Sequence, residues 1–248
     1  MADLKNPQNI MELIRFQRDL MRKYYRYMKE LLKTQYKKAA ILSYWLRDYL
    51  NYLKAEVTFK PRFNMSYKRG QIVYVNFGYR VGTELGGCHY AIVLDAHNSQ
   101  SNSQLTVIPM KSKREKSTSY SSIYHVDLYN EIQLCMMEKS IAIIDEETAY
   151  IKRLIDQYGE DLKSNPVAAK ELAKSKRVLD HAQHIREFAD NKLNHESVAD
   201  VGQICTISKI RIVHPTQKSD VLHDILLSLD TMSRIEEKIE HLYFSNSD

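Results

Sequence analysis

Residues 68–94 read KRGQIVYVNFGYRVGTELGGCHYAIVL and contain five of the chain's 7 glycines. Two apolar runs, residues 72–77 and 90–94, are rich in β-branched and aromatic residues and are typical of strands. The first run alternates between two faces, with Ile72, Tyr74 and Asn76 on one and Val73, Val75 and Phe77 on the other. Because glycine tolerates positive φ and allows close backbone approach, we expect a shaped loop between two strands. Such a loop is typical of a functional site.

The composition favours a globular protein with a polyanionic partner. The chain has 248 residues, 44% of them hydrophobic, which is enough for a sizeable core. The formal net charge is +5, and residues 1–58 contain 12 Lys and Arg against 6 Asp and Glu. Residues 68–125 are also basic, so a nucleic acid is a reasonable partner.

Cysteine usage and hydropathy indicate a reducing, intracellular setting. Cys88, Cys135 and Cys205 are odd in number and lack CxxC spacing, which argues against a disulfide framework or a zinc site. We find neither an apolar run of about 18 residues nor an apolar leader segment. We therefore expect a soluble cytoplasmic protein that does not enter a membrane.

The apolar spacing divides the chain into three regions. Residues 1–60 read as helical, with a bend near residues 37–40, and residues 130–197 read as an inserted helical hairpin broken before Pro166. The remaining segments, 66–129 and 198–248, form the third region. Its expected strands are residues 71–77, 88–95, 104–111, 121–127, 198–207 and 210–213, and its last helix is residues 218–243. Short strands joined by short turns predict a small antiparallel barrel or sandwich, hence an α+β fold.

Tyrosines alternate with Lys and Arg in the N-terminal helical region, from Tyr24 to Tyr52. This pattern fits an RNA-stacking surface, but it fits better a packed amphipathic face edged by tyrosines and snorkelling cations. The helices either cover a groove that binds RNA or build an oligomer interface.

Four motifs occur in one order along the chain: RGQIVYV at 69–75, VGTELGGCHYAIVL at 81–94, VIPMKS at 107–112 and GQICTIS at 202–208. Together they resemble the PemK/MazF family of toxin endoribonucleases. The resemblance covers residues 66–127 and 198–244 and implies an SH3-like antiparallel β-barrel that forms a homodimer. It also implies cleavage of single-stranded RNA without a metal or other cofactor, and neutralisation by a cognate antitoxin protein.

The resemblance assigns roles to particular residues. Gly82, Glu84, Gly86 and Gly87 belong to the loop over the RNA site, with Arg80 beside them. His89 stands where the family commonly has its catalytic arginine, Lys111 or Ser112 where it has a hydroxyl residue, and Cys205 where it has a second arginine. The element around Cys205 adds Gln203 and Thr206, and the basic loop after Ser112 adds Lys113 and Arg114 as phosphate contacts.

A rewired catalytic site follows from these replacements. Metal-free cleavage needs a base for the ribose 2′-OH, an acid for the leaving oxygen and donors for the phosphate. Histidine suits proton transfer because its ordinary pKa is about 6.5. We therefore assign acid/base chemistry to His89, phosphate charge to Lys111, and supporting hydrogen bonds to Ser112 and Thr206.

Two other readings stay open. Loss of the two family arginines would leave a catalytically impaired barrel that binds RNA or protein. In the third reading the barrel is only a scaffold for helical interactions.

Overall fold

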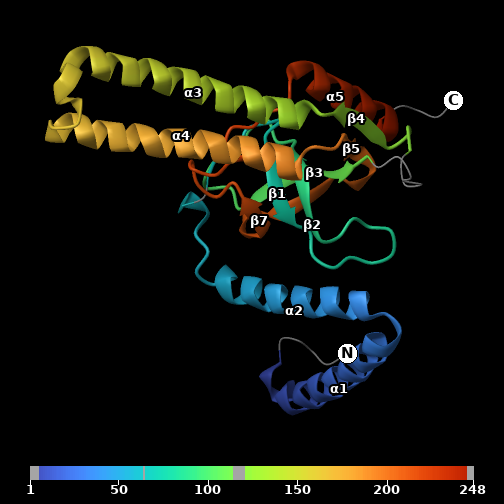
Figure 1. Cartoon of the computed structure of the whole chain (residues 1–248). Helices are drawn as coiled ribbons and strands as arrows, with labels where there is room; N and C mark the ends of the chain where they lie inside the picture. The colour runs from blue at the N-terminus through green and yellow to red at the C-terminus, as the bar shows by residue number, and fades with distance from the viewer. Residues whose placement is uncertain (1–5, 64, 114–120, 245–248) are drawn as a thin grey trace. The chain divides into compact units, whose positions relative to one another are not determined.

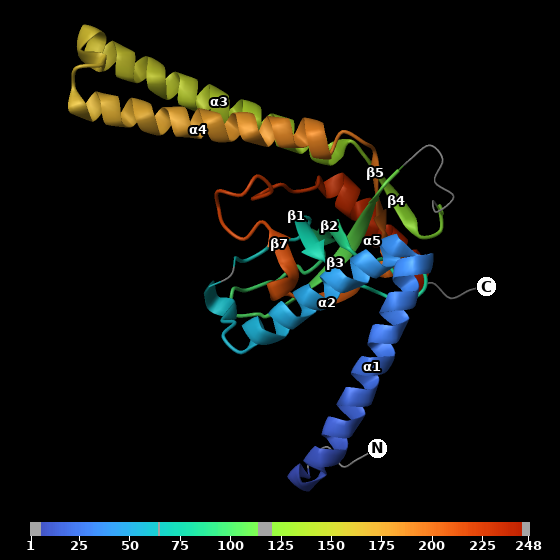
Figure 2. The ribbon, with the colours of Figure 1, turned by 60° about the horizontal axis from the view of Figure 1, so that its bottom comes forward.

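The chain separates into two units, Met1–Thr58 and Phe59–Asp248. The computed structural model describes residues 6–63, 65–113 and 121–244. The first unit holds α1 (Ile10–Thr34) and α2 (Tyr36–Glu56), and Figure 2 shows both. The helices meet at Gln35 and not at residues 37–40 as predicted, because Gln35 leaves the helical φ/ψ region while its N–H still bonds Leu31.

The two N-terminal helices leave most of their apolar side chains exposed. Only Leu31 of α1 and Ala39 of α2 are buried, whereas Phe16, Met21 and Tyr36 are each more than three-fifths exposed. Both helices are therefore amphipathic elements that carry apolar surface available for contacts.

The second unit is built on a seven-stranded sheet in which every pairing is antiparallel. The strand order is β4-β5-β3-β2-β1-β7, and β6 also pairs with β3. The predicted antiparallel α+β fold is confirmed. The strands are β1 (Ile72–Asn76), β2 (Cys88–Val93), β3 (Gln104–Ser112), β4 (His125–Tyr129), β5 (Ser197–Asp200), β6 (Cys205–Ser208) and β7 (Ile212–His214).

Side-chain alternation in β1 places hydrophobic residues on both faces of the sheet, as the sequence predicted. Val73, Val75 and Phe77 join one buried cluster, while Ile72 joins the other and Tyr74 packs against it. The second cluster also takes residues from three helices, including Met136, Ile185 and Ile235. The sheet thus has a core on each face, one of them covered by helices.

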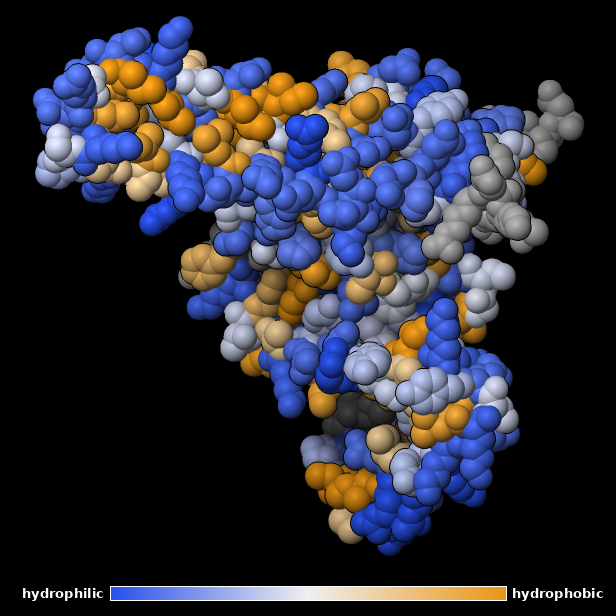
Figure 3. All heavy atoms as spheres, in the orientation of Figure 1, coloured by the Kyte–Doolittle hydropathy of each residue, from blue (hydrophilic) through white to orange (hydrophobic). Residues whose placement is uncertain are grey.

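The helices of this unit are α3 (Glu131–Tyr158), α4 (Pro166–Lys192) and α5 (Leu229–Tyr243). Figure 1 shows α3 and α4 side by side as the predicted hairpin. Asn165 caps α4 by accepting hydrogen bonds from the N–H groups of Val167 and Ala168, and Pro166 occupies the first turn. In Figure 3, hydrophobic residues line this hairpin, and Leu134 and Ile141 are among its exposed side chains.

Three predicted elements differ from the structure. The strand expected at residues 121–127 runs instead from His125 to Tyr129. The strand expected at 198–207 is interrupted by a 3-10 turn at Val201–Gln203, where Gly202 lies so close to the Tyr124 ring that a Cβ would approach it to 3.0 Å. The strand expected at residues 210–213 begins only at Ile212, after a second 3-10 turn over residues 209–211.

The last helix begins at Leu229 and not at residue 218, because Ser228 caps it by accepting a hydrogen bond from the Thr231 N–H. The residues before the cap belong to the core instead, since Leu222, Ile225 and Leu227 are buried. Leu222, Ile225 and Leu227 have the spacing of apolar residues in a helix, but they belong to an irregular segment that packs on the sheet.

Candidate active site

The glycine-rich segment forms a closed loop between β1 and β2. The Phe77 N–H donates to the Gly87 carbonyl at 2.8 Å, and the Gly87 N–H donates to the Gly78 carbonyl at 2.7 Å. A Cβ on Gly86 would lie 2.7 Å from the Gly78 oxygen, and Gly87 has φ +89°. Glycine is therefore required at the neck of the loop, for space at Gly86 and for conformation at Gly87.

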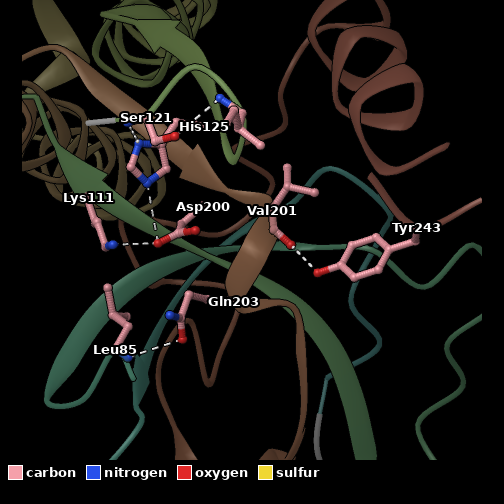
Figure 4. Close-up of polar contacts among 9 residues, drawn as sticks. Leu85, Lys111, Ser121, His125, Asp200, Val201, Gln203 and Tyr243 are labelled. Atoms are coloured by element: carbon pink, nitrogen blue, oxygen red, sulfur yellow. Dashed lines mark hydrogen bonds and ion pairs between the residues drawn. The ribbon is translucent and has the colours of Figure 1, made fainter. Parts of the chain in front are cut away.

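Two side chains predicted to bind RNA hold this loop in shape. Gln203 Oε1 accepts a hydrogen bond from the Leu85 N–H at 3.2 Å. Arg80 donates through Nη2 to Cys205 Sγ at 3.6 Å, and its guanidinium lies 5.8 Å from the centre of the Phe77 ring. Gln203 and Cys205, both from the segment 202–208, therefore anchor the loop at Leu85 and Arg80. Figure 4 shows the Gln203 contact.

Glu84 and Gly82 lie at the exposed tip of the loop. The Glu84 N–H closes a turn by donating to the Val81 carbonyl at 3.3 Å. Gly82 has φ +65° with open space around its Cα. The tip is therefore a solvent-facing turn, and the contacts that fix the loop lie at its neck.

A cleft of about 500 Å³ opens beside the loop, at the end of β2 and β3. It brings together three of the four predicted catalytic residues, His89, Lys111 and Ser112. Its remaining lining residues are Tyr74, Leu85, Cys88, Tyr90, Met110, Tyr129, Asn130, Ile132, Gln133, Lys192, Leu193, His195 and Ser197.

Thr206 does not belong to this cleft. It pairs with Thr106 on β3, and the two hydroxyls are 3.3 Å apart. Thr106 precedes Lys111 by five residues of extended strand, a separation of about 17 Å. The predicted grouping of Thr206 with Lys111 is therefore wrong, because β3 pairs with β6 at one end and meets the cleft at the other.

His89 lies just beyond the end of the β2–β3 pairing, which reaches Ala91 and Pro109. Burial lowers the pKa of its imidazole, and the nearby Lys111 ammonium lowers it further. Hydrogen bonding to the backbone of Gly86 and Met110 acts in the opposite direction, as expected for carbonyl acceptors that favour the protonated ring. The net effect keeps the imidazole neutral near pH 7 while placing acceptors around its N–H groups.

Lys111 is held by a buried carboxylate that the sequence analysis missed. Asp200 Oδ2 lies 2.5 Å from Lys111 Nζ and 3.5 Å from His125 Nε2, as drawn in Figure 4. The Ser121 N–H donates to His125 Nδ1 at 2.9 Å, which leaves His125 Nε2 facing Asp200. The Asp200 and His125 side chains are each only 4% exposed, against 26% for Lys111. The sequence did contain a signal for this residue, because Asp200 is the one charged residue in the otherwise apolar segment 198–201.

Lys113, in the basic loop after Ser112, was predicted to contact phosphate, but its charge is paired with carboxylates. Lys113 Nζ lies 2.8 Å from Asp127 Oδ1 and 3.7 Å from Glu196 Oε2. Two carboxylates therefore compete with phosphate for this ammonium. Arg114 lies outside the described residues.

Two tyrosines line the wall of the cleft beside His89. The Tyr74 and Tyr90 rings have centroids 4.9 Å apart and planes inclined by 47°. Burial raises the pKa of Tyr90 to about 12, with a further contribution from Tyr74. Neither phenol is therefore expected to lose its proton near neutral pH, and the pair supplies an aromatic surface with hydroxyl donors.

Another part of the cleft lining comes from the base of the helical hairpin. Asn130, Ile132 and Gln133 stand at the start of α3, and Lys192, Leu193 and His195 at the end of α4. The hairpin thus helps to shape the cleft, a role that its sequence did not reveal.

Comparison with known families matches residues 68–165 to the PemK-like, MazF-like toxin of type II toxin-antitoxin systems. The match confirms the PemK/MazF resemblance for this part of the chain. It begins before β1 and continues through α3, which the motifs had placed outside the resemblance, and it ends before β5 and β6. The search of curated proteins found no match.

Two further findings concern membrane spans and metal sites among the described residues. No helix among them is long and apolar enough to span a membrane. No group of three or more His, Cys, Asp and Glu side chains in the described part of the chain is arranged to hold a metal ion.

Proposed function

We propose that the second unit is the endoribonuclease toxin of a toxin-antitoxin pair and cuts single-stranded RNA in the cleft beside the glycine loop. One observation carries the proposal: within a PemK/MazF-like match, a neutral histidine, a lysine and a serine line the same cleft. In this proposal the sheet corresponds to the family's SH3-like barrel, and the protein acts in the cytoplasm as a homodimer.

The reaction is an attack of the ribose 2′-oxygen on the adjacent phosphorus. His89 takes the 2′-OH proton as the new O–P bond forms, and the bond to the 5′-oxygen breaks. The leaving oxygen receives the proton from the imidazolium, so the products are a 2′,3′-cyclic phosphate and a 5′-hydroxyl. Hydrogen bonding of the ring to the Gly86 and Met110 backbone stabilises the imidazolium between the two proton transfers.

Lys111 and Ser112 face the phosphate in this proposal. The Lys111 ammonium keeps two protons for donation while Asp200 holds it in place, and Ser112 donates a hydroxyl. Because Asp200 offsets much of the Lys111 charge, the residue acts by directed hydrogen bonds more than by long-range attraction. Asp200 is a positioning residue.

A second candidate function is RNA or protein binding without cleavage. The neutralisation of Lys111 by Asp200 favours it, since the cleft then offers little net charge to the pentacoordinate phosphate. The replacement of the family arginines at His89 and Cys205 acts in the same direction.

The partner we propose for restraint is a cognate antitoxin protein, with the α1–α2 unit as an alternative restraint or as an oligomer interface. Deletion of residues 1–60 separates these alternatives. A faster cleavage rate supports self-restraint, whereas an unchanged rate with a smaller oligomer supports an interface.

Cleavage of a long single-stranded RNA by the purified chain in EDTA tests the proposed function. We expect cleavage by the wild type, loss of it in His89→Ala, and unchanged cleavage in His97→Ala, a matched control because His97 is exposed outside the cleft. Binding without cleavage would favour the second candidate. A cut that survives His89→Ala would refute the assignment of His89.

A further inference from the structure

Tyr129 is an aromatic residue in a backbone conformation that disfavours it. It ends β4 with φ +51°, where the β4–β5 register shifts between Asp127 and Tyr129. Bulky side chains rarely adopt the left-handed region, and glycine or asparagine fits such a position better. The backbone therefore gives no reason for a tyrosine here.

The Tyr129 side chain lies at the cleft and not in the hydrophobic core. It is 53% exposed and lines the cleft together with Lys192 and His195 at the end of α4. Strained residues that persist at the rim of a cleft are characteristic of ligand contacts. A half-exposed phenol ring in this place presents a face on which a planar group can stack.

Lys192 carries a positive charge that is not paired with a carboxylate among the described residues, unlike the other two lysines of the site. It is exposed, and among residues 6–63, 65–113 and 121–244 no carboxylate lies within 4.0 Å of its ammonium. Lys111 and Lys113, in contrast, are paired with Asp200 and with Asp127. An anionic group that enters the cleft from the hairpin side therefore meets an unneutralised cation at Lys192.

We propose that Tyr129 and Lys192 form a nucleotide subsite for single-stranded RNA, in which one base stacks on the Tyr129 ring and its phosphate contacts Lys192. The subsite rests on the proposed function, since it places the strand that His89 cuts. Aromatic stacking tolerates any base, so this subsite positions the strand and adds affinity without reading sequence.

Binding of a fluorescent 2′-O-methyl RNA strand, which cannot be cut through its 2′-oxygen, tests the subsite by anisotropy in EDTA. Tyr129→Gly should weaken binding about 5- to 140-fold, the range for one lost base stack. The same change should leave the melting temperature unchanged or raise it, because glycine relieves the positive φ. Tyr129→Trp should bind as well as the wild type.

The role of the Lys192 charge is tested by the salt dependence of RNA affinity. Lys192→Met should lower affinity and reduce the slope of log K against log salt by about 0.7, the value for one contact to a single strand. Matched controls are Phe244→Ala, a ring 76% exposed outside the cleft lining, and Lys170→Met on the exposed surface of α4. Both controls should bind like the wild type.

The outcomes separate the subsite from the proposed function. RNA binding that depends on Tyr129, with no cleavage of ordinary RNA, would keep the subsite and overturn the nuclease. Cleavage and binding that are unchanged in Tyr129→Gly would overturn the subsite alone. A wild-type protein that neither binds nor cuts RNA would overturn both.

Discussion

Replacing Asp200 by asparagine removes the carboxylate that holds the site's lysine. The Lys111–Asp200 contact of 2.5 Å corresponds to about 7 kcal/mol of attraction at an effective dielectric constant of 20. Most of this is offset by the cost of desolvating the two ions, several kcal/mol each. Loss of one partner of a buried pair costs about 3–5 kcal/mol, and we expect about 3 because Lys111 is partly exposed and can turn to water.

Thermal unfolding measures this cost. A unit of this size loses about 2–4 °C of melting temperature per kcal/mol, so Asp200→Asn should melt about 6–12 °C below the wild type. Asp224→Asn is the matched control, since Asp224 lies 2.8 Å from Lys68 in a pair that is exposed on both sides. An exposed pair contributes about 0–1 kcal/mol, so the control should melt within about 4 °C of the wild type.

A double-mutant cycle identifies the cause of the loss. Lys111→Met should also destabilise the protein by leaving Asp200 unpaired, and the double variant should be more stable than the two separate losses predict. A melting temperature of Asp200→Asn equal to that of Asp224→Asn would rule out a stabilising buried pair. Additive losses in Asp200→Asn and Lys111→Met would do so as well.

Three further predictions concern the loop and the imidazole. Gly86→Ala should destabilise the unit by about 3 kcal/mol in urea unfolding, because its Cβ meets a backbone oxygen that cannot turn away, whereas Gly82→Ala should cost about 1–2 kcal/mol for its positive φ; equal losses would contradict the requirement for space. Gln203→Ala should speed hydrogen exchange of the Leu85 amide, and exchange like that of the wild type would show that the loop does not depend on this acceptor. Because the folded-state pKa of His89 is lowered, stability is lost as pH falls below about 6.5, so His89→Gln should lose less stability than the wild type between pH 7 and 5; parallel losses would contradict the lowered pKa.

Local patterning was sufficient to predict the β1–β2 region. The apolar residues from Ile72 to Phe77 predict a strand that is buried on both faces, and the glycine cluster predicts the loop. Both patterns can be recognised in the sequence because they involve neighbouring residues. Gly202, at the break between β5 and β6, packs against the Tyr124 ring, which comes from a distant part of the chain. A local pattern therefore could not distinguish one long strand from two short ones.

The site shows the same division between local and distant signals. His89 and Lys111 could be placed together because the family resemblance assigns both to one site, and both line the cleft. Asp200 meets Lys111 only through the β3–β5 pairing across the inserted hairpin. Thr206 was misplaced because adjacency in a motif does not say at which end of β3 its strand pairs.

In the proposed reaction, the ribose 2′-oxygen attacks the adjacent phosphorus in the cleft at His89. The most direct measurement uses two RNA strands of one sequence, one of them with a single 2′-deoxy nucleotide at the mapped cut, both incubated in EDTA. We expect a 2′,3′-cyclic phosphate end from the all-ribose strand and no cut at the deoxy position. Equal cutting of both strands would contradict it.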